Sequence, residues 1–60
     1  MKYTLFAFRQ HCKNLGVTIR EVADYMKVSR STVYRKLEEH DTDMIDNLYD
    51  AAEVVSSLKY

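Results

Sequence analysis

The chain of 60 residues contains no proline, one glycine and one cysteine. A chain with so few helix-breaking residues is most easily built from helices. The single cysteine, Cys12, excludes an intramolecular disulfide. No apolar run approaches the roughly 20 residues that a membrane span requires. Arg9, Gln10 and His11 break the apolar start of the chain too early for a secretory signal. We therefore expect one cytoplasmic domain over residues 1–60.

Strands also lack support, because no stretch alternates between apolar and polar residues. Hydrophobic residues make up 47% of the chain and charged residues 30%, which is the composition of a globular protein. So short a chain buries only about 60% of its unfolded surface, and we expect its stability to be marginal or helped by dimerisation. The prediction is an all-α, compact bundle of four helices, or five if the last helix is divided in two.

The first predicted helix covers residues 3–15. Its apolar residues recur at steps of three and four: Leu5, Phe8, Cys12 and Leu15. Gly16 supplies a stop signal directly after the helix. Cys12 is expected to be a thiol of the core, whereas His11 and His40 are interpreted as surface residues, since no carboxylate or metal partner is evident for either.

The last predicted helix begins after a polar connection, with Asp41 or Thr42 as its N-cap. Its inner face follows the same spacing: Met44 or Ile45, Leu48, Ala52, Val55 and Leu58. Asp46, Asp50 and Glu53 are assigned to the opposite side. Because the pattern continues without a break to about Leu58, one long helix is favoured over two.

Between these helices, residues 18–37 are predicted to form two short helices joined by a tight turn. Thr18 followed by Glu21 is the pattern of a capping box, and Ser29 is a strong N-cap for the second helix. The predicted inner faces consist of Val22, Ala23 and Met26, then Val33 and Leu37. The residues left pointing outward on the second helix are Arg30, Ser31, Thr32, Tyr34, Arg35 and Lys36. A surface of hydroxyls, cations and one aromatic ring suits a DNA groove.

The stretch from Gly16 to Leu37 resembles the helix-turn-helix of the Cro and lambda-repressor class of bacterial and phage regulators. The resemblance implies that Ala23 lies where the two helices cross and that Val33 is the buried residue of the recognition helix. The turn position that is usually glycine in this family is Lys27, which must then adopt a positive φ at a cost of about 1 kcal/mol. Residues 28–37 are also similar to Fis-type activator domains and to excisionase and resolvase modules.

The charges are separated along the chain, although the net charge is zero. Residues 1–36 hold eight Lys and Arg against two carboxylates, a net of +6, and residues 37–60 hold one lysine against seven carboxylates, a net of −6. A basic front that carries the recognition helix and an acidic rear would dock on a polyanion in one orientation. The alternative interpretation is that both are ordinary solvated surfaces.

These patterns predict a non-enzymatic, sequence-specific regulator of transcription whose helix 29–37 lies in the major groove of double-stranded DNA. The predicted DNA-binding residues are Thr18, Arg20, Lys27, Ser29, Arg30, Ser31, Thr32, Tyr34, Arg35 and Lys36. Arg30 and Arg35 are assigned to guanine, and Thr18, Arg20 and Lys36 to phosphates.

A homodimer, at least on DNA, is expected through Tyr49, Val54 and Leu58 of the last helix. No cofactor, metal, membrane or small-molecule ligand is expected. Two alternative functions stay open: a small protein-interaction module, of an antirepressor or DNA-mimic type, that uses the acidic C-terminal helix, and an excisionase-like DNA architectural protein. A winged excisionase-like fold would need strands.

Overall fold

The computed structural model describes residues 3–60, which form four α-helices and no strand. The helices are α1 (Leu5–Leu15), α2 (Ile19–Met26), α3 (Arg30–Glu38) and α4 (Thr42–Lys59). The all-α prediction and the single unbroken last helix are therefore confirmed. Residues 1 and 2, which the predicted domain includes, lie outside the described residues.

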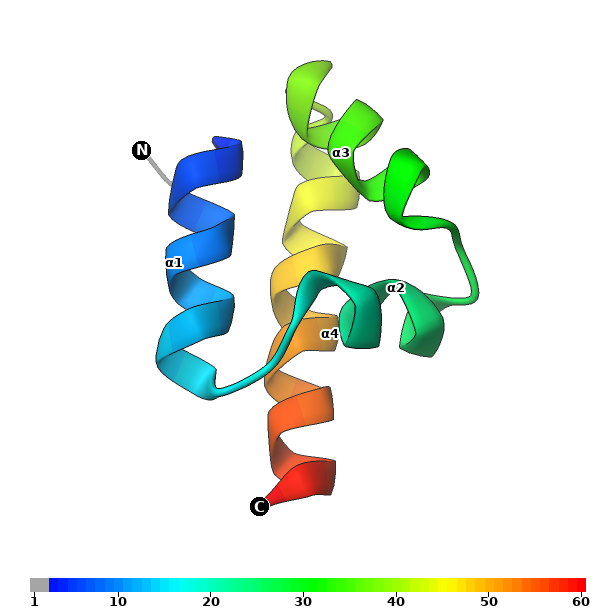
Figure 1. Ribbon diagram of the computed structural model, residues 1–60. Helices are drawn as coiled ribbons and strands as arrows, with labels where there is room; N and C mark the ends of the chain where they lie inside the picture. The colour runs from blue at the N-terminus through cyan, green and yellow to red at the C-terminus, as the bar shows by residue number, and fades with distance from the viewer. Residues whose placement is uncertain (1–2) are drawn as a thin grey trace.

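The longest helix, α4, is the element against which the other three pack. In Figure 1, α1 lies along one side of α4 and runs in the same direction, while α2 runs across α4. α3 lies beside the first turns of α4, to which it is directly connected. Because α2 and α3 both pack on α4, their orientation relative to each other is fixed.

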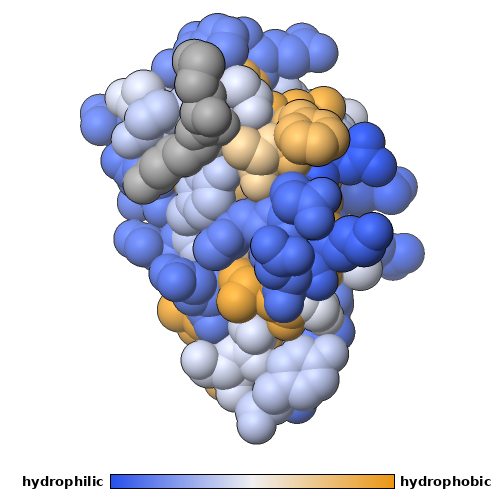
Figure 2. Space-filling model, turned by 90° about the vertical axis from the view of Figure 1, so that its left-hand side faces the viewer, coloured by the Kyte–Doolittle hydropathy of each residue, from blue (hydrophilic) through white to orange (hydrophobic). Residues whose placement is uncertain are grey.

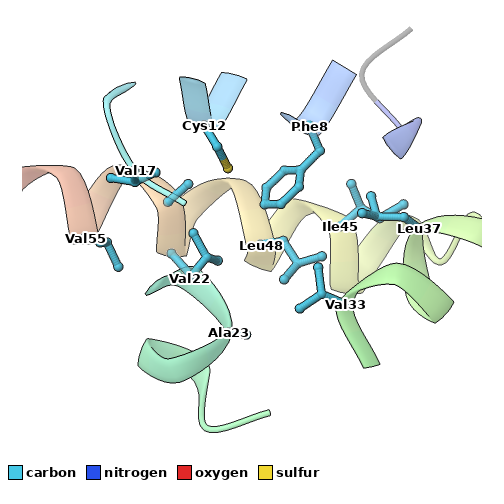
Figure 3. Close-up of a cluster of buried hydrophobic side chains, with 12 residues drawn as sticks. Phe8, Cys12, Val17, Val22, Ala23, Val33, Leu37, Ile45, Leu48 and Val55 are labelled. Carbon is cyan, nitrogen blue, oxygen red and sulfur yellow. The ribbon is translucent and has the colours of Figure 1, made fainter. Parts of the chain in front are cut away.

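The core is made of apolar side chains from all four helices and from the connection between α1 and α2. Figure 3 shows Phe8 and Cys12 of α1 directed toward α4, with Val22 and Val33 approaching it from α2 and α3. The buried residues are Phe8, Cys12, Val17, Val22, Ala23, Val33, Leu37, Ile45, Leu48, Ala51, Ala52 and Val55. Full burial of a side chain such as that of Val33 contributes about 1.5–3 kcal/mol. The inner faces predicted for α1, α2 and α3 contribute to this core, with Leu5, Leu15 and Met26 only partly buried.

The inner face of α4 departs from the prediction at its end, where Leu58 is 75% exposed and Ala51 is buried instead. Two successive steps of three residues separate Ala52 from Leu58. Each step falls about 60° short of a full turn of the helix. Leu58 is therefore rotated away from the core side that Ala52 occupies, which explains why the prediction of its burial was wrong.

Two polar residues are less exposed than the sequence suggested. Asp46, assigned to the outer side of α4, is half-buried and accepts a hydrogen bond of 3.1 Å from the Tyr3 hydroxyl. His11, interpreted as a surface residue, is half-buried because its ring packs against that of Tyr49, with centroids 4.7 Å apart. His40 is exposed as expected. It has a φ of 55° in the α3–α4 connection, and its Nδ1 lies 3.2 Å from the Tyr3 carbonyl.

Candidate nucleic-acid interface

The first turn of α2 contains the predicted capping box. Thr18 Oγ1 accepts from the Glu21 N–H at 3.1 Å, and Glu21 Oε1 accepts from the Thr18 N–H at 2.9 Å. The Thr18 hydroxyl also donates to Glu21 Oε1 at 3.2 Å. Because this donor is already used within the protein, a phosphate contact by Thr18 would require that bond to open. The role of Thr18 visible in the structure is to fix the start of α2.

The turn between α2 and α3 is built around Lys27, whose φ of 60° and ψ of 40° are left-handed. The Lys27 N–H donates to the Asp24 carbonyl at 3.1 Å, and the Val28 N–H donates to the Ala23 carbonyl at 3.0 Å. These two bonds form a Schellman motif, which ends α2 and turns the chain sharply. The positive φ expected at Lys27 is confirmed. The side chain of Lys27 is exposed at the turn.

The start of α3 is fixed by its own cap. Ser29 Oγ accepts from the Thr32 N–H at 3.1 Å and lies 2.9 Å from Thr32 Oγ1. Val33, one turn into the helix, is completely buried, as is Leu37 to within 1%. The hydroxyls of Ser29 and Thr32 therefore serve the helix end, and Val33 and Leu37 hold the inner side of α3 against the core.

The remaining side chains of α3 fall into three strips, because residues four apart lie one above the other on a helix. Ser31 and Arg35 are exposed and lie farthest from the core. Arg30 and Tyr34 are exposed on the flank that faces α1 and the start of α2. The opposite flank carries Thr32 and Lys36, which are half-buried. Of the six side chains predicted to point outward, four are exposed and two are half-buried.

Lys36 lies at the acidic end of α3. Its Nζ is 3.6 Å from Glu39 Oε1 and 3.6 Å from Asp41 Oδ2, and its side chain is 30% exposed. These two carboxylates compete with phosphate for the Lys36 ammonium, which makes Lys36 a weaker partner for phosphate than the cations nearer the start of α3. Arg20 and Arg30 line a common hollow, and Lys36 is not part of that lining.

This hollow, of about 370 Å³, lies between α1, α2 and α3. Its cations are Arg9 and Lys13 of α1, Arg20 of α2 and Arg30 of α3. The other lining residues are Cys12, Val17, Thr18, Ile19 and Tyr34. Burial raises the pKa of the Cys12 thiol to about 11, so this group stays uncharged at neutral pH. The cations of the hollow therefore have no anionic side chain beside them in its lining.

Arg9 and Lys13 were not among the predicted DNA-binding residues. Both are exposed on α1, beside the apolar stripe of that helix. Figure 2 views the molecule from the α1 side and shows that hydrophilic side chains cover much of this surface. Their spacing of four residues was visible in the sequence, but their nearness to Arg20 and Arg30 depends on the packing of three helices.

The residues predicted for a dimer contact do not lie on one surface. Val54 and Leu58 are four apart on α4 and both are exposed. Tyr49 is half-buried and packs edge-on against Phe8, with ring centroids 5.3 Å apart. Nine residues separate Tyr49 from Leu58, which places them on opposite sides of the helix. The structure thus brings Val54 and Leu58 together and leaves Tyr49 apart.

Over residues 3–60, none of the helices is long and apolar enough to cross a membrane. Within the same part of the chain, no three His, Cys, Asp or Glu side chains are grouped so that they could hold a metal ion.

Comparison with protein families places the same segment in a known context. Residues 14–40 match a family model described as the helix-turn-helix domain of resolvase. The comparisons with curated proteins and with solved structures found no match. The matched segment contains all of α2, the turn at Lys27 and all of α3. The match supports a helix-turn-helix DNA-binding domain in this chain, and it does not single out the Cro and lambda-repressor class.

Proposed function

We propose that the chain is a cytoplasmic, non-enzymatic regulator of transcription that binds specific DNA sequences by placing α3 in the major groove. The observation that carries this proposal is the exposed surface of α3. Ser31 and Arg35 face away from the core, Arg30 and Tyr34 lie on the flank beside them, and the carboxylate of the helix comes only at Glu38. Such a surface offers donors and cations to base edges and phosphates without a carboxylate in its first two turns.

The individual side chains suit this role. An arginine can donate two hydrogen bonds to the O6 and N7 atoms of guanine, which is the commonest specific contact in the major groove. Arg35 has the most outward position for such a contact, and Arg30 lies at the start of the helix. Ser31 is placed between them for a base or a phosphate. Tyr34 offers a ring to a thymine methyl group or a hydroxyl to a phosphate.

The orientation of α3 on DNA follows from the charges at its two ends. Arg30 and Arg20 border the start of α3, whereas Glu38, Glu39 and Asp41 surround its end. A phosphate backbone is attracted to the first end and repelled from the second. We therefore place the N-terminal part of α3 deepest in the groove, with α2 lying across the backbone, as in other helix-turn-helix domains.

The proposal is tested by selecting bound duplexes from a random library and then measuring affinity for a selected and a scrambled duplex between 50 and 200 mM salt. We expect one enriched sequence, tighter binding to the selected duplex, and a steep linear fall of log K with log salt, since phosphate contacts release counterions. Absence of enrichment together with affinity independent of salt would show that the chain does not function through DNA.

An excisionase-like architectural role is a second candidate function, because the family model that matches residues 14–40 describes the helix-turn-helix domain of resolvase. Both functions use the same helix-turn-helix. They differ in what binding does to the duplex. A circular-permutation gel-shift assay separates them: an architectural protein bends its site, so the mobility of the complex depends on the position of the site in the fragment. A regulator that reads bases alone leaves the mobility nearly constant.

A further inference from the structure

We propose that the hollow between α1, α2 and α3 binds a phosphate of the DNA backbone, with Arg9 and Lys13 of α1 and Arg20 of α2 as its ligands, while Arg30, which also lines the hollow, reads a base edge. This inference rests on the proposed function and deepens it, because it adds α1 to the surface that contacts DNA. The phosphate in question belongs to the DNA strand that borders the major groove occupied by α3. Neither the helix-turn-helix pattern nor the family match, which begins at residue 14, includes Arg9 or Lys13.

The charged side chains that line the hollow are all cationic. Four of the nine Lys and Arg residues of the chain line it, and its lining contains no Asp or Glu among the described residues. Arg20 Nε lies 4.0 Å from Asp24 Oδ2, and both side chains are exposed. An ion pair of that kind contributes little. The mutual repulsion of these cations is relieved when an anion enters.

Apolar side chains lie beneath the cations of the hollow. Val17 and Cys12 are buried and Ile19 is half-buried, so the floor of the hollow is largely apolar. A concave site with charges of one sign and low-dielectric walls concentrates the electric field. Because the Cys12 thiol is uncharged, it adds no negative charge to the lining of the hollow. A phosphodiester entering the hollow would thus feel a stronger attraction than one beside an isolated surface lysine.

The hollow lies beside the exposed surface of α3. Arg9 and Lys13 lie one turn apart on α1 and belong to one flank of that helix. Arg30 and Tyr34 form the opposite wall, and they adjoin the outward strip of Ser31 and Arg35 on α3. A strand that borders the groove entered by α3 would therefore run past the hollow. The hollow has a volume of about 370 Å³ and is open to solvent, so a phosphodiester group can enter it.

The test compares Arg9→Gln, Lys13→Gln and the double variant with the parent on the selected and the scrambled duplex over the same salt series. The double variant is expected to lower the slope of log K against log salt by about 1, because one phosphate contact is lost, and each single variant is expected to lower it by less. Affinity should fall by the same factor on both duplexes, because a phosphate contact carries no sequence information. Lys13→Arg is the matched control: it keeps the positive charge at the same position of α1 and should leave the slope unchanged.

Ethylation interference locates the contact on the DNA. Ethyl groups on the phosphates that flank the site should hinder binding of the parent, and one or two of these positions should stop hindering the double variant.

Unchanged slopes and an unchanged interference pattern, in variants that still prefer the selected duplex, would refute the inference and leave the proposed function standing. A loss of preference between the duplexes would also refute it, since Arg9 and Lys13 would then be reading bases. A parent that binds neither duplex would overturn the proposed function itself.

Discussion

The ammonium of Lys59 lies 3.2 Å from Glu21 Oε1, which joins the last turn of α4 to the first turn of α2. The same ammonium donates to the Gly16 carbonyl at 3.0 Å, and the Tyr60 hydroxyl donates to that carbonyl at 3.3 Å. Since Glu21 is also half of the capping box with Thr18, one carboxylate fixes both the start of the helix-turn-helix and its attachment to the end of α4.

This arrangement makes the stability of the fold depend on the charge of Glu21. The Thr18 backbone N–H and, after it, the Lys59 ammonium lower the pKa of Glu21 below its ordinary value of 4.5. A carboxyl whose pKa is lower in the folded state stabilises the fold above its unfolded pKa, and this contribution disappears as pH falls through the folded pKa. We therefore expect the Glu21 contribution to be complete above about pH 4.5 and to be lost progressively below it.

The measurement is the urea midpoint of the parent and of Glu21→Gln at several pH values from 7 to 3. Glutamine can still accept from the Thr18 N–H, so the variant removes the charge and keeps the cap. The parent should be the more stable at pH 7, and the difference should shrink as pH falls below about 4.5. Glu53→Gln, at an exposed position of α4, serves as the control. A difference that stayed constant from pH 7 to pH 3 would contradict the role assigned to the Glu21 charge.

The turn at Lys27 leads to a second prediction. A left-handed backbone costs a non-glycine residue about 1–2 kcal/mol, and glycine avoids this cost while losing about 0.5–1 kcal/mol in chain entropy. Lys27→Gly should therefore raise the free energy of unfolding by up to about 1 kcal/mol in urea titrations. Lys27→Ala removes the same side chain but keeps the strain, and it should give no such gain. An equal gain in both variants would mean that the lysine side chain, not its backbone, is responsible.

The features of the fold that the sequence predicted are those fixed by residues close together in the chain. The capping box needs only Thr18 and Glu21. The positive φ at Lys27 is implied by the resemblance to the Cro and lambda-repressor class, in which this turn position is usually glycine. Burial of Val33 and Leu37 follows from their spacing on one helix. Each of these depends on local geometry with a known period, which explains why it could be inferred without the positions of other helices.

The features that could not be predicted depend on contacts between helices. Arg9 and Lys13 approach Arg20 and Arg30 only because α1 packs beside the start of α2 and α3. The packing of Tyr49 on Phe8, and with it the separation of Tyr49 from Leu58, depends on how α4 is rotated about its axis. Sequence spacing identifies which residues share a strip of one helix, but not which strip faces a given neighbour.

The outward strip of α3 supplies a prediction about recognition. Arg35→Ala and Arg30→Ala should each weaken binding to the selected duplex by about 1–3 kcal/mol, because each would remove a contact with a base edge. The same variants should weaken binding to the scrambled duplex less, so the preference between the two falls. Far-ultraviolet circular dichroism should show unchanged helix content, since both side chains are exposed and outside the core. If both variants bound the two duplexes as the parent does, α3 would not be the recognition helix.

The last prediction concerns two copies of the chain on DNA. A single recognition helix reads a few base pairs, and one small domain buries little surface on DNA. To distinguish a specific site from the many other sites of a genome, two copies bound to half-sites about 34 Å apart are favoured. Val54 and Leu58 form the exposed apolar strip of α4 that we propose as the contact. Asp50 and Glu53 lie beside this strip. Their repulsion across a symmetric contact should keep free chains apart at low ionic strength and make dimerisation depend on DNA.

Sedimentation of the complex with the selected duplex should give two chains per duplex, and Leu58→Ser should reduce this to one or abolish cooperative binding. Phe6→Ser is the matched control, because Phe6 is 78% exposed on α1 and Leu58 is 75% exposed on α4. Loss of the second chain in Phe6→Ser but not in Leu58→Ser would move the contact from α4 to α1. One chain per duplex at saturation, on a site without two-fold symmetry, would instead show that the parent binds as a monomer. The contacts of α3 and of the hollow would then have to account for all of the specificity and affinity.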